Sequence, residues 1–333
     1  MYTKFFGFKS KPFEITPDPK FLFLSESHKE ALAHLTYAVR ERKGFTVITG
    51  EVGTGKTTLV QSLLARLDGN AKTAYIFNPK LGSTDLLHSI CEDFGMKSQK
   101  RSKGQYISQL HKFLLDCYAR NENVVLIIDE AHTLDPNLLE EVRLLTNLET
   151  PKSKLLQVIL IGQPELDDTL NSPEFRQLKQ RVSLRYHLQP LGGEDTKKYI
   201  KKRLRMAGAF DHNIFTPKAL NKIYKYTKGI PRLINIICDN ALLTGYTTDQ
   251  KIIGQKIIRD VINNLDGFSL QKKRRRLILF KVIPIVLLSL VAFILLASLL
   301  NSRWEITEWA RLCKNAILKF CQEALGKWSR WVL

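Results

Sequence analysis

The sequence predicts an α/β fold in which a parallel sheet is covered by helices, followed by a smaller helical domain and one transmembrane helix. Apolar runs of strand length alternate with runs of helix length up to Pro190, an order typical of parallel sheets. Beyond Pro190 only helical patterns follow. Residues 277–300 are mostly apolar, with Lys281 as the only charged residue, and 24 residues are long enough to cross a bilayer.

Five apolar runs are expected to form the strands, at residues 45–49, 73–77, 124–128, 155–163 and 182–188. The third and fourth are continuously apolar, as in strands buried on both faces. Helices are expected between them, and the helix that follows Ser27 is predicted to begin with a capping box of Ser27 and Glu30. The helical domain is expected to contain helices at 196–206, 217–225, 232–246 and 252–265.

These patterns divide the chain into five parts. They are an α/β domain at 1–191, a helical domain at 192–268, a basic juxtamembrane linker at 269–276, a transmembrane helix at 277–300 and a tail at 301–333. Residues 1–20 lack the apolar run of a signal peptide. The basic run at 272–276 would also suit nucleic acid, but beside an apolar span it favours retention on the cytoplasmic side.

The tail contains all four tryptophans of the chain, Trp304, Trp309, Trp328 and Trp331. Apolar residues recur there every three or four positions, with charged residues largely between them. This pattern predicts an amphipathic helix at the outer membrane–water boundary, in contact with lipid. A helix that packs on the transmembrane helix of a partner is the alternative.

The net charge says little about the partner, and the cysteine spacing bears only on metal sites and disulfides. The net charge is +19, and residues 272–333 hold 12 Lys and Arg against 3 Asp and Glu, which leaves +10 for residues 1–271. A basic surface favours acidic partners, either nucleic acid or anionic lipid, without deciding between them. No two of the five cysteines form a C-x-x-C pair, so neither a zinc site nor a disulfide framework is predicted.

The segment from Gly50 to Thr58, GEVGTGKTT, satisfies the pattern G-x-x-x-x-G-K-[ST] between a predicted strand and a predicted helix. In such a loop, backbone N–H groups and the helix N-terminus face a phosphate. Lys56 is expected to reach the β- and γ-phosphates, and the Thr57 hydroxyl to bind Mg²⁺. The candidate phosphate-binding residues are Gly50, Val52, Gly53, Thr54, Gly55, Lys56, Thr57 and Thr58.

Two adjacent acids, Asp129 and Glu130, close the third strand. Because ligands bind at the carboxyl ends of parallel strands, we expect Asp129 to complete the Mg²⁺ site with Thr57, and Glu130 to orient or deprotonate the attacking water. Gln163 closes the fourth strand, where its amide could contact the γ-phosphate or the water, or could simply cap a loop.

Arginines are the third group of candidate catalytic residues. An arginine inserted beside a γ-phosphoryl group raises the rate of transfer by roughly 10³–10⁵. Arg176, Arg181 and Arg185 follow the fourth strand and are candidates. Arg232 begins a helix after Gly229, and Arg is unfavourable at that end unless it faces an anion. An exposed surface position is the alternative for the first three, and an ordinary helix start for Arg232.

Together these motifs resemble the ExeA/GspA family of AAA+ secretion ATPases. The resemblance covers residues 1–265, and it is carried by the stretches MYTKFFGF at 1–8, KPF at 11–13, TPDP at 16–19, GEVGTGKT at 50–57, DEAH at 129–132, GQPEL at 162–166, QRV at 180–182 and GIPR at 229–232. It implies an AAA+ P-loop fold with Walker A at Lys56 and Thr57, and Walker B at Asp129 and Glu130. Gln163 corresponds to sensor 1, Arg232 to sensor 2, and Arg181 to the arginine finger that acts in a neighbouring subunit.

The resemblance also implies ATP and Mg²⁺ as cofactors, a hexamer-like ring and a single-pass location in the bacterial inner membrane with the ATPase in the cytoplasm. ATP hydrolysis would then drive assembly or remodelling of a secretion, pilus or polysaccharide system through an envelope membrane protein. Secretion-type members of the family carry a peptidoglycan-binding domain after the span, where this chain has only residues 301–333, so the resemblance does not extend to cell-wall binding or secretin assembly, and both stay open.

Two other functions stay open at this point. A cluster of six basic residues at 197–205 suits a membrane-tethered, DNA-associated AAA+ ATPase, although Tyr199, Ile200 and Leu204 account for the buried side of that helix. A nucleotide-gated scaffold with very slow turnover is the third class. In addition, one of the six phenylalanines within residues 1–40 could stack on adenine rather than pack in the core.

Overall fold

The computed structural model of the chain describes residues 1–15, 21, 23–67, 69, 71–77, 82–96, 102–209 and 213–265. Residues Met1–Ile262 form one compact unit. In the described part of the chain, no helix combines the length and apolar character needed to cross a bilayer. The predicted juxtamembrane linker at 269–276, span at 277–300 and tail at 301–333 lie outside the described residues.

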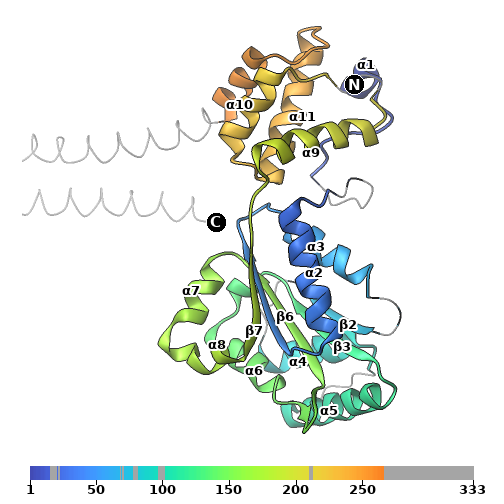
Figure 1. Cartoon of the computed structure of the whole chain (residues 1–333), viewed down its shortest axis with the longest axis vertical. Coiled ribbons are helices and arrows are strands. Elements are labelled where there is room, and N and C mark those ends of the chain that lie inside the picture. The colour runs from blue at the N-terminus through green and yellow to red at the C-terminus, as the bar shows by residue number, and fades with distance from the viewer. Residues whose placement is uncertain are drawn as a thin grey trace, which may run out of the picture. The chain divides into compact units, whose positions relative to one another are not determined.

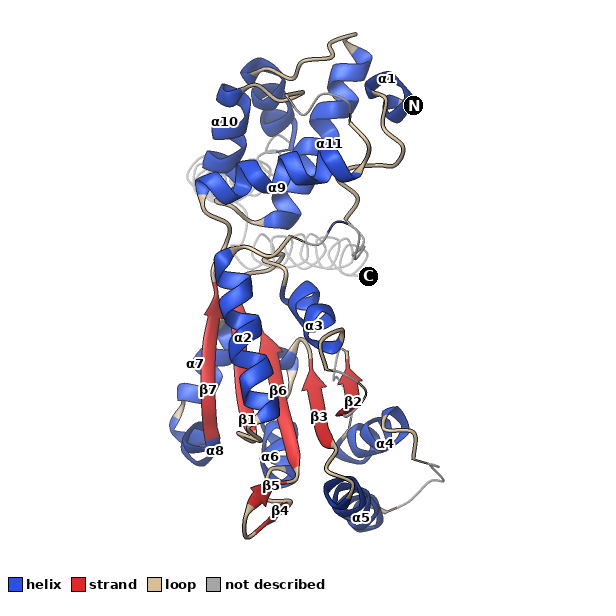
Figure 2. Ribbon diagram, turned by 45° about the vertical axis from the view of Figure 1, so that its right-hand side comes forward, coloured by secondary structure: helices blue, strands red, loops and turns tan. Residues whose placement is uncertain are grey.

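The predicted parallel sheet is confirmed, and it has five strands in the order β2-β3-β6-β1-β7 (Figure 1; all five are labelled in Figure 2). The strands are β1 (Phe45–Gly50), β2 (Ala71–Ile76), β3 (Asn123–Ile128), β6 (Leu156–Gly162) and β7 (Val182–Leu188). All four neighbouring pairs are parallel, so the carboxyl ends of β1, β3 and β6 meet at one edge of the sheet. That edge is where ligands bind in open α/β sheets.

Helices cover both faces of this sheet (Figure 2). Helices α2 (Glu26–Arg40) and α3 (Lys56–Leu64) contribute to the core on one face. The other core receives side chains from α4 (Ser83–Asp93), α5 (Lys103–Ala119), α6 (Pro136–Leu145), α7 (Glu165–Asn171) and α8 (Arg176–Arg181). The short 3-10 helices Ala131–Thr133 (η2) and Pro173–Phe175 (η3), and the hairpin of β4 (Glu149–Thr150) and β5 (Ser153–Lys154), complete the connections.

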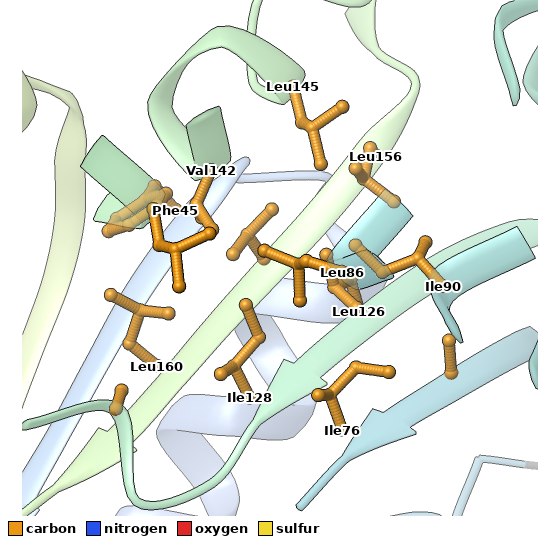
Figure 3. Packing of buried hydrophobic residues seen from close by; sticks show 14 of the residues in the cluster. Phe45, Ile76, Leu86, Ile90, Leu126, Ile128, Val142, Leu145, Leu156 and Leu160 are labelled. Carbon is orange, nitrogen blue, oxygen red and sulfur yellow. The ribbon is translucent and has the colours of Figure 1, made fainter. Parts of the chain in front are cut away.

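Successive residues of the central strands enter opposite cores because side chains alternate along a strand. In β3, Leu126 and Ile128 enter the core beneath α4 and α6, whereas Ile127 enters the core beneath α2 and α3. Figure 3 shows Ile128, Leu160 and Leu86 in the first of these clusters. A strand that is buried on both faces must be apolar throughout, which is why β3 and β6 read as continuous apolar runs.

The expected start of α2 is wrong by two residues. The N-cap is Ser25, whose side chain accepts a hydrogen bond from the His28 backbone N–H, so the helix begins at Glu26. Ser27 lies inside the first turn, and its hydroxyl contacts the Tyr186 hydroxyl at 3.2 Å instead of capping the helix. Both serines fit a capping pattern locally, and the contact with β7 is the tertiary reason that Ser27 is used otherwise.

Beyond β7 the described chain is helical, as expected. It forms α9 (Gly193–Met206), α10 (Pro217–Thr227), α11 (Pro231–Thr247) and a helix over residues 255–265. The N-terminal helix α1 (Tyr2–Phe6) packs with these helices rather than with the sheet. The Tyr2 hydroxyl donates to the Asp239 carboxylate, and the rings of Phe13 and Phe215 lie edge to face at 6.2 Å. These phenylalanine contacts are core packing.

Candidate nucleotide-binding site

The loop between β1 and α3 has the backbone geometry of a phosphate cradle. Gly53 and Gly55 both have left-handed φ angles, of 81° and 101°, and Gly55 is the N-cap of α3. A Cβ on Gly53 would lie 2.6 Å from the Cβ of Arg232, so both the conformation and the close approach of α11 require glycine. Gly50 is the last residue of β1, directly before this loop.

Lys56 is the first residue of α3 and is almost fully buried. Its Nζ donates hydrogen bonds to the backbone oxygens of Gly50 at 2.8 Å and Glu51 at 3.0 Å, which fixes the ammonium against the loop. Burial lowers the pKa of Lys56, while the carboxylates of Glu130 and Asp129 act in the opposite direction. The Lys56 ammonium is therefore held beside the loop, where it can bind an anion that occupies the loop.

Asp129 follows β3 directly and is only 1% exposed. Its carboxylate accepts hydrogen bonds from the Thr57 hydroxyl at 3.3 Å, the Tyr75 hydroxyl at 2.8 Å and the Glu130 backbone N–H at 2.8 Å. Burial, and then the bond to Asp129, raise the pKa of Tyr75. The sequence motifs did not indicate Tyr75, because it comes from the neighbouring strand β2.

The pair Thr57 and Asp129 fits a magnesium ion. Both supply oxygen atoms, which Mg²⁺ prefers, and their contact places the two donors side by side. Among the residues that the structure describes, no group of three or more His, Cys, Asp and Glu could hold a metal. Mg²⁺ commonly takes one or two protein oxygens and completes its shell with phosphate oxygens and water, so Thr57 and Asp129 are sufficient protein donors.

Glu130 and Gln163 lie at the carboxyl ends of β3 and β6, and both line the same cavity. A residue that the motif analysis left without a role, His132, lies between them. Its Nδ1 is 3.4 Å from Glu130 Oε2, and its Nε2 is 2.8 Å from Gln163 Nε2. The DEAH sequence contained this histidine, but nothing local showed that it would reach the next strand.

The cavity that contains these groups has a volume of about 470 Å³, which is in the usual range for small-molecule sites. Of the predicted phosphate-loop residues, Val52, Gly53, Thr54, Gly55, Lys56, Thr57 and Thr58 line it. Arg232 lines it from α11, and its backbone N–H donates to the Gly53 oxygen at 3.3 Å. Phe21, Phe23 and Tyr199 give the cavity an aromatic wall as well.

Arg203 also lines this cavity, which corrects its assignment to the basic surface cluster of α9. It is 5% exposed, and it donates to the Tyr199 hydroxyl at 2.7 Å and to the Glu14 backbone oxygen at 3.1 Å. Its guanidinium carbon lies 4.8 Å from the centroid of the Phe21 ring. The side chain thereby joins α9 to the N-terminal segment at the wall of the site.

His28 supports the phosphate loop from α2. Its Nδ1 lies 2.6 Å from the Ser25 hydroxyl and its Nε2 lies 3.0 Å from the Thr54 backbone oxygen. The side chain is buried, and burial lowers the pKa of His28. Sequence reasoning missed this residue because a histidine inside an amphipathic helix carries no local signal of its tertiary partner.

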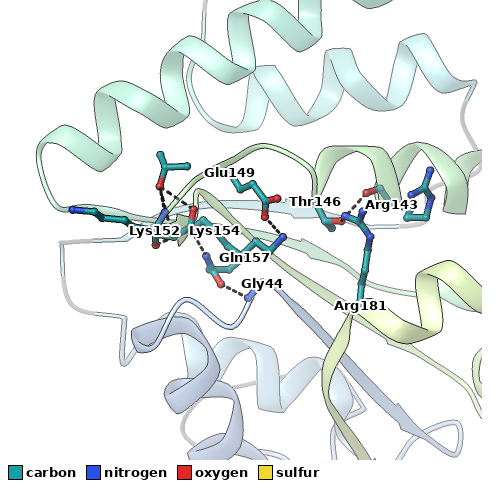
Figure 4. A network of polar contacts seen from close by, with 10 residues as sticks. Gly44, Arg143, Thr146, Glu149, Lys152, Lys154, Gln157 and Arg181 are labelled. Carbon is teal, nitrogen blue, oxygen red and sulfur yellow. Dashed lines mark hydrogen bonds and ion pairs between the residues drawn. The ribbon is translucent and has the colours of Figure 1, made fainter.

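Arg181 lies at the other edge of the sheet. It directly precedes β7, whose first residue, Val182, is in register with Phe45 at the start of β1. The seven residues of β7 therefore separate Arg181 from the edge that holds the phosphate loop by roughly 20 Å. Its guanidinium donates to the Thr146 hydroxyl at 2.9 Å (Figure 4). Nearby, Arg185 pairs with Asp167 at 3.4 Å.

The phosphate loop, the buried acid beside its threonine and the strand order together define an ATPase domain of AAA type. Residues 39–170 match the family described as AAA domain. The chain is 49% identical over 247 residues to General secretion pathway protein A from Aeromonas hydrophila, a stretch that covers 74% of this chain and 45% of that protein. The resemblance predicted from the motifs is confirmed, although the chain spans less than half the length of this relative.

Solved structures support the same fold. The Aeropyrum pernix ORC2 protein, in ADPNP and ADP complexes, aligns with a TM-score of 0.58 and 16% identity over 77% of this chain and 71% of its own. Cdc6p from Pyrobaculum aerophilum aligns with a TM-score of 0.58 and 17% identity over 74% of this chain and 70% of its own. At these identities the likeness concerns the fold alone.

Proposed function

We propose that the chain is a membrane-anchored AAA+ ATPase that binds and hydrolyses ATP with Mg²⁺ to drive assembly or remodelling of a bacterial envelope system. The observation that carries the proposal is the carboxyl edge of the sheet, where the Thr57 hydroxyl contacts Asp129 and Lys56 is held against the glycine loop. The 49% identity to a general secretion pathway protein supports the secretion setting.

In this proposal the loop binds the triphosphate and Lys56 contacts its β- and γ-phosphates. Thr57 and Asp129 would hold Mg²⁺, which when bound neutralises charge that develops on the phosphate oxygens. Glu130 then accepts the proton of the attacking water, and Gln163 orients that water or the γ-phosphate. Arg232 contacts the phosphates from α11, so that the helical region responds to the state of the nucleotide.

The proposal needs a second subunit. Arg181 lies too far from its own phosphate loop to stabilise a transferred phosphoryl group there, and we assign it to the site of a neighbour. Each site would then be complete only between two chains, which supports a ring, hexamer-like in form. A repeated head-to-tail interface generates a ring when its rotation closes.

Membrane attachment and the envelope partner rest on the sequence. The apolar segment at 277–300 and its basic flank support a single-pass anchor in the inner membrane with the ATPase in the cytoplasm. The DNA-associated alternative is weakened at α9, where Arg203 is buried, Lys197 pairs with Glu194 at 2.7 Å and Lys198 with Asp195 at 3.7 Å. Those pairs reduce the positive charge that a duplex would meet.

The test uses the full chain, expressed in bacteria and followed through membrane fractionation and purification in detergent. We expect it to stay in the membrane fraction after a high-salt wash, and to hydrolyse ATP through many turnovers only when Mg²⁺ is present. A Glu130→Gln chain should bind ATP but not hydrolyse it. Tight binding with a single slow turnover would replace the motor with a scaffold, and strong stimulation by duplex DNA would favour the alternative function.

A further inference from the structure

The backbone of the segment 129–133 holds His132 in one place. Glu130 adopts a left-handed conformation with φ of 52°, which is uncommon for a residue other than glycine. Three hydrogen bonds support it: its N–H donates to Asp129 Oδ1, and its carbonyl accepts from both the N–H and the hydroxyl of Thr133 at 2.9 and 2.8 Å. These hydrogen bonds fix the backbone of Glu130, which is the N-cap of the short helix η2 that contains His132.

The segment 129–133 packs closely against the end of β6 at Gly162. A Cβ on Gly162 would lie 3.2 Å from the His132 backbone nitrogen and 2.9 Å from a methyl group of Leu166, so the close approach depends on glycine at that position. The imidazole of His132 is 15% exposed, and it contacts residues on both sides of this junction. It belongs neither to the phosphate loop nor to the magnesium site.

The contacts of the imidazole depend on where its ring proton lies. If the Gln163 side-chain amide donates to Nε2 at 2.8 Å, a neutral ring carries its proton on Nδ1, and Glu130 Oε2, 3.4 Å from Nδ1, is the acceptor within reach of that proton. If Gln163 instead turns its amide oxygen toward Nε2, the proton lies on Nε2. Nδ1 then accepts the Gln163 backbone N–H at 3.5 Å, and Glu130 loses its donor.

We propose that His132 is a positioning residue that couples Gln163 to Glu130, so that the orientation of the Gln163 amide decides whether Glu130 is held. The inference rests on the proposed function, in which Gln163 meets the γ-phosphate and Glu130 activates water. An acceptor such as a phosphate oxygen draws the amide N–H of Gln163 toward itself and turns its oxygen to the ring. In this way the arrival of the γ-phosphate changes the hydrogen bonding of the general base.

The first test reads the tautomer directly and needs no activity. In ¹⁵N-histidine spectra of the full chain in detergent, the His132 resonances, assigned by their loss in His132→Gln, should show the Nδ1–H tautomer. In Gln163→Ala, which removes the amide that donates to Nε2, the Nε2–H tautomer should gain population. An Nε2–H ring in the wild type, or an unchanged tautomer in Gln163→Ala, overturns the proposal.

The second test is kinetic. His132→Ala should lower kcat about 10- to 100-fold, the order expected when the ring no longer holds the Gln163 amide in place beside the γ-phosphate, with the Kd of ATP within about twofold of wild type. The amide nitrogen of asparagine replaces Nδ1 and that of glutamine replaces Nε2, so His132→Asn and His132→Gln each keep a donor for only one of the two neighbours, and both should behave like alanine. The double variant His132→Ala/Gln163→Ala should lose no more than the worse single variant, because the two residues act as one unit.

The matched control is His111→Ala, at an exposed histidine of α5, which should leave kcat unchanged. Full activity in His132→Asn or His132→Gln, or additive losses in the double variant, overturns the coupling. A joint fall of kcat, nucleotide affinity and unfolding temperature in His132→Ala would show a structural role instead and would overturn it as well. Failure of the wild-type chain to bind ATP refutes the proposed function and leaves the tautomer result standing on its own.

Discussion

The two edges of the sheet differ in whether the functional residues at each edge form a site within one chain. At the carboxyl edge, Lys56, Asp129 and Gln163 come from three neighbouring strand ends and meet within one chain. At the amino edge of β7, Arg181 has a single hydroxyl partner, Thr146, and no acid among its described contacts (Figure 4). The first edge is a site, whereas the second edge presents an arginine that forms no ion pair at contact distance in the described part of the chain and interacts with Glu140 only at longer range.

This difference shows that one chain can assemble a phosphate site by itself, because the carboxyl ends of neighbouring parallel strands lie at the same edge of the sheet. A residue at the start of a strand is excluded from that site by the length of the strand. If such a residue has a catalytic role, it must act on another copy of the protein. The predictions below test this division between the two edges, beginning with the largest expected effect.

Removal of the arginine at the amino edge should abolish hydrolysis. We expect Arg181→Ala to lower kcat by roughly 10³–10⁵, the range measured for inserted arginines. Glu130→Gln should be equally inactive, but an equal mixture of the two chains, exchanged before assay, should regain about a quarter of wild-type activity because about one interface in four pairs an intact Glu130 with an intact Arg181.

Thr146→Val is the matched control for this experiment, since it removes the contact of Arg181 within the chain and keeps the guanidinium. It should hydrolyse ATP nearly as well as the wild type. Mixtures that stay inactive despite verified subunit exchange would contradict the division, and so would an Arg181→Ala chain with normal kcat.

Removal of the lysine at the carboxyl edge should weaken the binding of ATP itself and not only its hydrolysis. Lys56→Ala is expected to raise the Kd of ATP about 100-fold, because it deletes a buried charged donor aimed into the loop. Fluorescent-nucleotide titration measures this effect. The control Lys112→Ala, at an exposed position on α5, should bind like the wild type. Equal affinity in both variants would refute the site.

The hydroxyl of Tyr75 should matter through Asp129. Tyr75→Phe removes the 2.8 Å hydrogen bond to the carboxylate, and we expect the Mg²⁺ concentration for half-maximal ATP binding to rise about tenfold, as for other residues that orient a metal ligand. ATP binding is titrated with MgCl₂ at a fixed nucleotide concentration. Tyr37→Phe, at an exposed tyrosine of α2, is the control. No difference between the two variants would show that the Tyr75 hydroxyl does not orient Asp129 toward the metal.

The smallest effect concerns stability at the histidine beneath the loop. Burial lowers the pKa of His28 below its ordinary value of 6.5. Above pH 6.5 the side chain is neutral in both folded and unfolded chains, so it does not change stability with pH. Below that pH the unfolded chain takes up a proton first, and the free energy of unfolding falls by up to about 1.4 kcal/mol per pH unit until the lower pKa is reached.

His28→Gln removes this titration, so its free energy of unfolding should fall less steeply between pH 6.5 and 5 than that of the wild type. Urea denaturation at several pH values measures both slopes. The carboxylates and the other histidines titrate in both chains and cancel in the comparison. Identical slopes would mean that His28 is not held neutral beneath Thr54.

Much of the carboxyl edge could be predicted, because its signals are local. The phosphate loop is a contiguous motif, and each strand that ends in a functional residue is a continuous apolar run. Arg203 shows where a signal was present and was read wrongly. It follows Tyr199 by four residues, so it shares the buried side of α9, yet its charge placed it among the surface lysines. Helical spacing was the better guide than residue type.

The sequence by itself determined the order of strands and helices, the phosphate loop with Lys56 and Thr57, and the acids that close β3. Those features depend on neighbours within a few residues, where spacing and polarity act directly. Only the tertiary structure decided that Tyr75 binds Asp129, that His28 supports Thr54, that His132 joins Glu130 to Gln163 and that Arg181 lies at the far edge. Most of these partners are brought together only by packing between separate elements. A local sequence pattern does not specify which residue from a distant part of the chain will lie next to a given side chain.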